Sequence, residues 1–170
     1  KTDAFNPDLP FFLDFRTIQK ERTRFFYVLP YSARKALVEY TSFTPPIDLK
    51  QDLETPLKNY CNHILGIKKY TVTYEEGTTI PLRIKKSSRS QTKRILDIGI
   101  QGGLLKPSTG YGFTRIIDDA RQTAENLADC GAPLPVKSVP FIFSLADSIM
   151  MRVMLRFGEH IQGIFLKLFE

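Results

Sequence analysis

The sequence contains few of the residues that build metal centres or disulfide frameworks: two histidines and two cysteines among 170 residues. Two histidines exclude a multi-histidine metal site, and Cys61 and Cys130 have no partner at metal-ligand spacing. We therefore expect no metal, and two buried free thiols in a reducing compartment. The sequence also lacks an apolar run of the ~18–20 residues needed to span a bilayer. The chain is expected to touch a membrane but not to cross it.

The balance of charge is mildly basic, with 24 lysines and arginines against 18 acidic residues and a net charge of +6. A hydrophobic content of 42% with 25% charged residues is ordinary for a folded protein, which argues against a disordered chain. The positive surplus suits a phosphate-bearing cofactor or a membrane surface, or serves solubility alone. We expect no nucleic-acid partner, because basic residues are scattered outside 83–94 and no RNA-binding signature accompanies them.

Three strand-like runs open the chain and predict an antiparallel meander, because only short turns separate them. These runs are rich in aromatic and β-branched residues and comprise Phe11–Thr17, Arg24–Leu29 and Lys35–Phe43. An apolar stripe at helical spacing then predicts a helix over 49–65, which Gly66 would end.

The remaining pattern predicts a β-hairpin followed by a helical end. Tyr70–Tyr74 and Thr79–Ile84 flank a turn at 75–77, as the two strands of a hairpin would, and 85–93 is expected to be a surface loop. Helices are expected over 111–127, 141–156 and 159–169, with a proline-containing linker at 131–140.

A glycine-rich loop over 102–112 (GGLLKPSTGYG) follows a strand-like run at 95–100 and leads into a predicted helix. Small residues at a helix mouth favour a concave anion site, because backbone amides and the positive end of the helix dipole point at the same place. We expect the loop to hold a ligand. The alternative is an ordinary strand-to-helix turn.

Four motifs, in order over residues 10–125, resemble those of the lycopene cyclase family, FAD-dependent enzymes that close the ionone rings of carotenoids. The motifs are FLDFR at 12–16, FFYVLPYS at 25–32 with ALVEYT at 36–41, EGTTIPL at 76–82 and KPSTGY at 106–111. Lys106 departs from the family's usual histidine, and Tyr40 departs from the second acid of the plant motif. No GxGxxG turn for the ADP half of FAD is present. We therefore expect the C-terminal part of such an enzyme, which by itself binds FAD poorly.

The resemblance implies an α+β fold with a mostly antiparallel substrate-domain sheet. To this it adds the FAD-contacting strand–loop–helix and terminal helices of a flavin-hydroxylase-like, glutathione-reductase-type FAD fold. The implied segments are 1–94 for the substrate-binding sheet with one helix, 95–130 for the FAD-contacting unit and 131–170 for the C-terminal helices.

The implied reaction is the acid-catalysed, non-redox cyclisation of lycopene ends to β-ionone rings. Reduced FAD would stabilise the cationic intermediate, with NAD(P)H as the reductant of the flavin. Such a site needs a carboxylic acid kept protonated among apolar groups, because desolvation disfavours the charged form. Glu39 is the first candidate for this acid, since it shares strand parity with Leu37 and Phe43. Asp14 and Glu76 are further candidates, although Asp14 could instead form an ion pair with the nearby Arg16 that fixes the sheet.

The resemblance also assigns ligand contacts. The expected FAD contacts, mostly through backbone amides, are Gly99, Gln101, Gly102, Gly103, Pro107, Ser108, Thr109 and Gly110. Four aromatic residues are expected to line the carotenoid site unless they serve as core or helix packing: Phe26, Tyr27, Phe43 and Tyr111. The protein would be cytoplasmic and peripheral on the inner face of the plasma membrane, with its terminal helices against lipid, and it could form a homodimer.

Two other functions fit the same pattern. One is another FAD-dependent enzyme on this scaffold, such as a prenyl (geranylgeranyl) reductase or an aromatic hydroxylase, which would not depend on Glu39 as an acid. The other is a non-catalytic domain that binds lipid or a protein partner.

Overall fold

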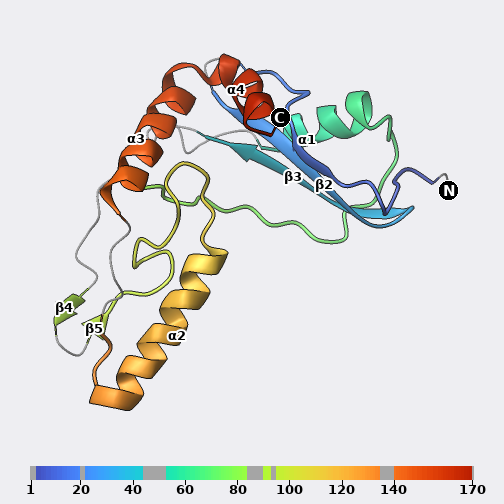
Figure 1. Cartoon of the computed structure of the whole chain (residues 1–170). Helices are drawn as coiled ribbons and strands as arrows, with labels where there is room; N and C mark the ends of the chain where they lie inside the picture. Colours follow the sequence, from blue (N-terminus) through green and yellow to red (C-terminus); the bar gives the residue numbers. More distant parts are fainter. Residues whose placement is uncertain are drawn as a thin grey trace. The chain divides into compact units, whose positions relative to one another are not determined.

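The computed structural model describes residues 3–19, 22–43, 53–83, 90–92, 95–134 and 140–169 (Figure 1). These residues form an α+β structure, as the sequence predicts. The chain divides into two compact units, one comprising Lys1–Thr78 with Val153–Glu170 and the other Thr79–Arg152. The end of the chain thus groups with the N-terminal sheet. The expected functional segments 1–94, 95–130 and 131–170 stay a prediction.

The first unit is built on a three-stranded antiparallel sheet in the order β1-β2-β3. Its strands are β1 (Phe11–Asp14), β2 (Arg24–Ser32) and β3 (Lys35–Ser42). A two-residue turn joins β2 to β3, and a short turn of this kind requires antiparallel neighbours. The predicted meander is confirmed, although β1 ends three residues before its expected limit at Thr17.

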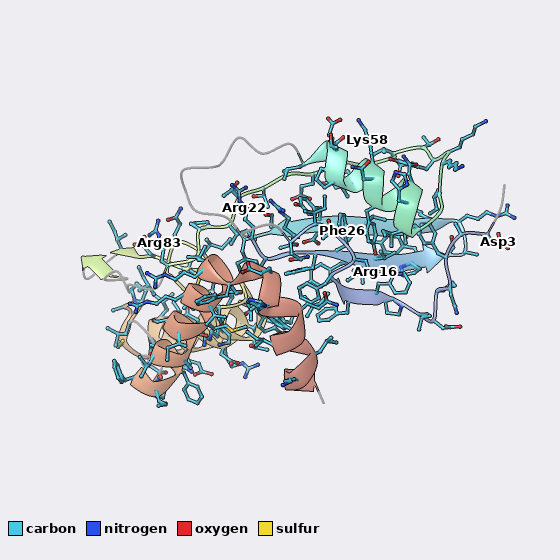
Figure 2. All side chains as sticks on the ribbon, turned by 90° about the horizontal axis from the view of Figure 1, so that it is seen from above. Asp3, Arg16, Arg22, Phe26, Lys58 and Arg83 are labelled. Atoms are coloured by element: carbon cyan, nitrogen blue, oxygen red, sulfur yellow. The ribbon has the colours of Figure 1, made fainter. Side chains whose placement is uncertain are left out.

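One face of this sheet carries the core of the unit. Phe26 and Val28 of β2 are fully buried there against Tyr60. The rings of Phe26 and Tyr60 stack with centroids 3.8 Å apart and planes 7° from parallel, and Figure 2 shows Phe26 on the sheet beside helix α1. Burial of each such side chain contributes roughly 1.5–3 kcal/mol, so this face stabilises the unit.

The helix that covers this face combines α1 (Glu54–Asn59) and the π-helix η2 (Tyr60–Ile64). The predicted helix is therefore confirmed for its later part, while its expected start at 49–52 lies outside the described residues. Gly66 follows with φ +70°, a left-handed conformation that suits glycine, as expected for the residue that ends the helix.

The predicted hairpin over 70–84 is wrong. Residues 70–83 run without strand pairing, and Ile84 lies outside the described residues. Val72 and Tyr74 are 61% and 74% exposed, so the alternating pattern has no surface to bury itself against. An isolated two-stranded hairpin is at best marginally stable in water, and no third strand in the described part of the chain supports this segment.

The second unit contains a small two-stranded ladder and a long helix. Strands β4 (Ser90–Thr92) and β5 (Ile95–Leu96) pair antiparallel. The expected strand over 95–100 therefore stops after two residues, and the expected loop over 85–93 contains a strand in its described part. Helix α2 (Phe113–Cys130) confirms the helix predicted after the glycine-rich loop. Cys130 at its end is exposed, which corrects the expectation of two buried thiols.

The chain ends in helices α3 (Phe141–Arg156) and α4 (Ile161–Phe169), joined by the 3-10 turn η3 (Gly158–His160). Both predicted terminal helices are confirmed. Helix α4 belongs to the first unit, where the side chains of Met154 and Ile161 are fully buried and Thr23 donates its hydroxyl to the Met154 carbonyl at 3.3 Å. Among the described residues, none of the helices has the length and apolar character that crossing a bilayer demands.

Candidate functional site

The second face of the three-stranded sheet carries the first candidate acid. Residues of one parity, Phe25, Tyr27 and Leu29, lie on the face opposite Phe26 and Val28, and Phe25 is itself buried there. Their partners on β3 are Thr41, Glu39 and Leu37 in that order. Strand register thus places Glu39 opposite Tyr27 on a face that is otherwise largely apolar. Leu29 and Leu37, the pair next to it, are 39% and 38% exposed.

Glu39 is an exposed carboxylate with two polar neighbours. Its Oε1 accepts a hydrogen bond from the Thr41 hydroxyl at 3.1 Å. Burial raises the pKa of Tyr27, and the negative charge of Glu39 across the strand pair raises it further. Tyr27 therefore keeps its proton near neutral pH and can donate it in a hydrogen bond.

A β-bulge in β1 adds more apolar side chains to the Glu39 face. The register shifts between Phe11 and Asp14, and Leu13 within the bulge has φ +56°. Because of this extra residue, Phe12 contacts Tyr27 with ring centroids 5.0 Å apart, and Phe15 contacts Phe25 at 5.6 Å. Asp14, by contrast, is turned to the opposite face, where it meets Tyr60.

Asp14 forms a closed ionic cluster with Arg16 and Tyr60. The Arg16 guanidinium donates to both carboxylate oxygens at 2.6–3.1 Å, and the Arg16 backbone amide donates to Oδ1 at 3.0 Å. The Tyr60 hydroxyl donates to Oδ2 at 2.5 Å. Burial alone would raise the pKa of Asp14, but the hydrogen bonds from Arg16 and Tyr60 outweigh it and lower the pKa below its ordinary value.

This cluster makes Asp14 an ionised carboxylate with a partner on each oxygen, which suits an ion pair that fixes the sheet better than a proton donor. Tyr60 is held in its neutral form, because burial and the adjacent Asp14 both raise its pKa. The alternative weighed for Asp14, a local pair with Arg16, is the geometry that the structure has.

We expect Asp14→Asn to lower the free energy of unfolding by about 1–3 kcal/mol at neutral pH, because the Asp14 side chain, only 7% exposed, loses its charge while its donors remain. Since the folded-state pKa of Asp14 lies below the ordinary value, its contribution is present above about pH 4 and is lost as the pH falls through the folded-state pKa. Urea unfolding at pH 7 and pH 3, followed by circular dichroism, should show a smaller pH dependence in the variant.

A matched control is available at Asp3, whose carboxylate pairs with Arg34 at 2.7 Å. Both side chains are more than half exposed there, so Asp3→Asn should change stability by less than about 1 kcal/mol. Equal losses from the two substitutions would contradict a special role for the Asp14 cluster.

The three candidate acids are not brought together. Asp14 and Glu39 lie on opposite faces of the sheet. Glu76 is exposed in the unpaired segment after the first helix, where its Oε2 accepts a hydrogen bond from the Tyr74 hydroxyl at 2.9 Å. Of the three, Glu39 alone combines a carboxyl group with an apolar surrounding surface. No group of His, Cys, Asp or Glu within the described ranges has the arrangement of a metal site.

The four expected carotenoid contacts lie on different faces of the sheet and in different units. Tyr27 lies beside Glu39, and Phe43 meets Phe25 at a centroid distance of 6.1 Å near the end of that face. Phe26 is fully buried in the core on the opposite face, so it leaves the set of candidates. Tyr111 is 53% exposed at the end of the glycine-rich loop, in the second unit.

The glycine-rich loop of the second unit is a set of tight turns. Gly99, Gly103 and Gly110 all have φ between +57° and +72°. The loop uses several of its own amides: those of Gly102 and Gly103 donate to the carbonyls of Ile98 and Ile100. The amides of Thr109 and Gly110 both donate to the carbonyl of Lys106. These four amides are therefore already paired within the loop.

Lys106 and Ser108 anchor the loop to helix α3 through Asp147. The Asp147 side chain is 4% exposed and accepts from the Ser108 hydroxyl at 2.5 Å and from the Lys106 ammonium group. Burial raises the pKa of Asp147, but these two donors outweigh it and the pKa is lowered. Sequence inspection missed this partnership, although an acid inside the apolar run 141–151 and a lysine at the usual histidine position were its signal.

The part of the loop left for a ligand is smaller than expected. Gly102 and Ser108 are buried, and Pro107 is half-buried beside them, whereas Gln101, Gly103 and Thr109 are exposed. Helix α2 begins at N-cap Gly112 without a side-chain cap, so the first amides of the helix have no partner from that residue. These groups are the candidates for an anionic or polar ligand.

The geometry defines a class of protein. One unit contains an antiparallel sheet with an apolar face that carries a carboxyl group, and the other contains a glycine-rich loop that leads into a long helix. Comparison with known families agrees with this class. Residues 1–163 match the family model described as lycopene cyclase protein, and the chain belongs to the lycopene cyclase family.

Three similar curated proteins are named lycopene beta cyclases. The chain is 33% identical over 103 residues to a chloroplastic lycopene beta cyclase of Nicotiana tabacum, 58% of this chain and 20% of that protein. It is 30% identical over 104 residues to the chloroplastic/chromoplastic enzyme of Narcissus pseudonarcissus, 61% of this chain and 20% of that protein. It is 28% identical over 108 residues to the lycopene beta-cyclase of Pantoea ananas, 61% of this chain and 28% of that protein.

The chain thus matches between a fifth and just over a quarter of the length of these relatives. No solved structure matches it significantly.

Proposed function

We propose that this protein supplies the acid-bearing substrate face of an enzyme that cyclises the ends of lycopene to β-ionone rings. The observation that carries the proposal is the position of Glu39 on the apolar face of the sheet, in a chain of the lycopene cyclase family. The relatives named above are lycopene beta cyclases, which supports this substrate and this ring product.

In the proposed reaction, protonated Glu39 gives its proton to the terminal double bond of the polyene. The tertiary cation that results is attacked by a nearby double bond of the same chain, which closes a six-membered ring. Loss of a proton from the ring leaves a new double bond, so the product is an isomer of the substrate. A polyene that covers the exposed Glu39 side chain would remove water from it, which favours the protonated acid.

The aromatic side chains next to Glu39 fit the cationic step. Tyr27 lies directly across the strand pair, and Phe12 contacts Tyr27 at a centroid distance of 5.0 Å. Aromatic faces attract a cation, typically by about 0.5–2 kcal/mol, and more when water is excluded. The neutral hydroxyl of Tyr27 adds no negative charge that would capture the cation.

We expect the second unit to hold part of the FAD that the family implies. The exposed side chain of Gln101 can hydrogen-bond a ribityl hydroxyl, and the uncapped start of α2 offers amides to an anionic group. When bound, reduced FAD would contribute negative charge that stabilises a cation, with NAD(P)H as its reductant. Ser108 and Lys106 would serve indirectly, because both hold the loop on Asp147.

The start of α3 supports a peripheral contact with lipid, where a carotenoid would reside. Phe141, Ile142 and Phe143 are 79%, 65% and 57% exposed. An exposed cluster of this kind marks either an interfacial membrane contact or a surface for a second copy of the chain. We propose the membrane contact, on the inner face of the plasma membrane.

The proposed function is tested by pigment analysis of lycopene-accumulating cells that express the longest reading frame containing this chain. We expect conversion of lycopene to ring-bearing carotenes, because the family and the Glu39 face both point to this reaction. Lycopene that stays unchanged beside folded, flavin-loaded protein would overturn the proposal. A reductase or hydroxylase on the same scaffold, or a non-catalytic lipid-binding domain, would then take its place.

A further inference from the structure

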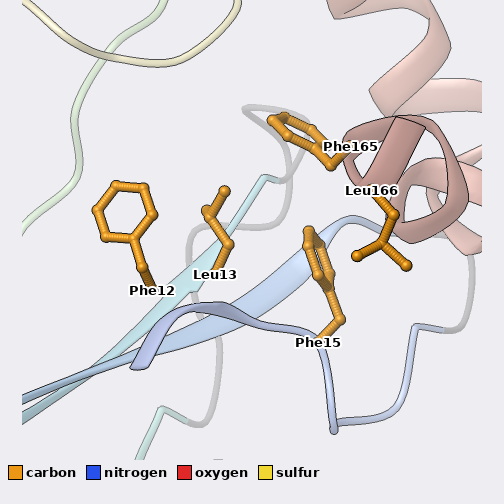
Figure 3. A pocket seen from close by; sticks show the side chains of 5 residues that line it. All are labelled: Phe12, Leu13, Phe15, Phe165 and Leu166. Carbon is orange, nitrogen blue, oxygen red and sulfur yellow. The ribbon is translucent and has the colours of Figure 1, made fainter. Parts of the chain in front are cut away.

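We propose that a groove between β1 and α4 binds the end group of the polyene, holding the carbons that become the ring. The groove is lined by five apolar side chains, Phe12, Leu13, Phe15, Phe165 and Leu166 (Figure 3). This inference rests on the proposed cyclase function and adds to it a place for the reacting end of the substrate. All five residues belong to the first unit.

The groove exists because of the bulge at Leu13. A leucine at φ +56° is in a strained conformation that most L-residues avoid. In a regular strand, Phe12 and Phe15 would point to opposite faces, since their separation is an odd number of residues. The extra residue brings both onto the Glu39 face, and Figure 3 shows them with Leu13 around one space.

The C-terminal helix provides the other wall. Phe165 of α4 packs against Phe15 with ring centroids 6.0 Å apart, and Leu166 lines the same space. Helix α4 is held in this position by buried Ile161 at its start. The groove is therefore formed by residues from both ends of the chain.

The size and the lining select an apolar ring-sized ligand. The groove has a volume of about 230 Å³. An apolar cavity of about 150 Å³ accommodates benzene, so this space suits a six-membered ring that carries methyl groups. A stable protein–protein contact needs about 800 Å² of surface on each partner, far more than five side chains around a groove of this size provide.

The groove also adjoins the strand pair that carries the candidate acid. Phe12 forms one of its walls and touches Tyr27, and Tyr27 is the strand partner of Glu39. An end group seated in the groove would lie along the face that carries the carboxyl group. Phe12 and Leu13 are then specificity-determining residues, because they set the space available to the end group.

The test uses the 170-residue chain and retinol, a polyene that bears an ionone ring and gains fluorescence in apolar surroundings. We expect saturable binding that β-ionone and its open-chain isomer pseudoionone both displace, because the end group is open-chain before the reaction and a ring after it. Phe12→Ala and Leu166→Ala should each weaken retinol binding about fivefold to tenfold. Both side chains are mainly exposed, at 70% and 58%, so the variants should fold.

Phe141→Ala is the matched control, since Phe141 is also exposed but lies in the second unit. Retinol binding that survives Phe12→Ala and Leu166→Ala unchanged, or that falls equally with Phe141→Ala, would overturn the proposal. So would light scattering that shows a dimer dissociated by Phe12→Ala, because a second copy would then occupy the groove.

The groove and the proposed function fail separately. Glu54→Gln, on α1 and outside the groove lining, should leave retinol binding unchanged. If retinol binds in the groove but the pigment assay shows no ring formation, the groove proposal stands and the proposed cyclase function is rejected. If rings form but Phe12→Ala does not change retinol binding, the cyclase function stands and the groove proposal is rejected.

Discussion

Gly158→Ala is expected to destabilise the first unit by about 3 kcal/mol or more. A Cβ at this position would lie 2.5 Å from the Arg22 carbonyl carbon and 2.7 Å from the Thr23 amide nitrogen. Both are backbone atoms, so relief requires the chain segments to separate. The segments that separate would be the turn before α4 and the start of β2, where Thr23 is fully buried.

Gly163→Ala provides a control of opposite sign. Gly163 lies five residues further along, inside α4, where an added Cβ would have no neighbouring atom within 4 Å and φ is not left-handed. Alanine there should stabilise the helix by about 0.5–1 kcal/mol. Urea unfolding followed by circular dichroism would measure both variants, and equal effects of the two substitutions would contradict the close approach at Gly158.

Gly158→Ala also tests the role of the groove. Undocking of α4 removes Phe165 and Leu166, which form one wall. Gly158→Ala should therefore weaken retinol binding even under conditions where the sheet remains folded, whereas Gly163→Ala should not. A variant that loses stability but keeps full retinol affinity would place the ligand elsewhere.

The three-stranded meander was predictable because both of its determinants are local. Alternation in β2 and β3 sets which side chains are buried, and the two-residue turn fixes their antiparallel pairing. Strand parity by itself is enough to place Glu39 among apolar residues. The sequence does not show whether Phe26 or its neighbour Tyr27 faces the core, because both are aromatic and the answer depends on where Tyr60 packs.

Other features depend on contacts between distant segments. The bulge at Leu13 lies within a run that looks like a regular strand, and Asp14 at its end bonds to Tyr60, 46 residues away. The hairpin predicted over 70–84 had good strand propensity but no neighbouring strand within the described residues. Strand propensity reflects how well a residue fits a half-buried sheet surface, so it does not produce a strand where no neighbouring strand forms that surface.

The glycine-rich loop shows the same limit within a candidate site. Its glycines were correctly expected to permit tight turns, and Gly99, Gly103 and Gly110 have left-handed φ values. The sequence could not show that the amides of Gly102 and Gly110 donate hydrogen bonds to carbonyls inside the loop. Ligand contacts there remain a prediction for the exposed groups, Gln101 and the start of α2.

Glu39→Gln is expected to reduce conversion of lycopene by about 10²–10⁴-fold in cells that express the longest reading frame containing this chain, because glutamine cannot give up a proton. The side chain is exposed and accepts a hydrogen bond from Thr41. Glutamine can still accept that bond, so stability should change by less than about 0.5 kcal/mol. Pigment analysis and urea unfolding together separate chemistry from folding.

Glu54→Gln is the matched control for this prediction. Glu54 is a similarly exposed glutamate on α1, where it pairs with Lys58 at 2.7 Å and lies away from the Glu39 face. Its loss removes a surface ion pair worth about 0.3–0.5 kcal/mol and should leave pigment conversion intact. If Glu39→Gln retains full conversion, the proton must come from another group, and the apolar face would bind substrate without supplying the acid.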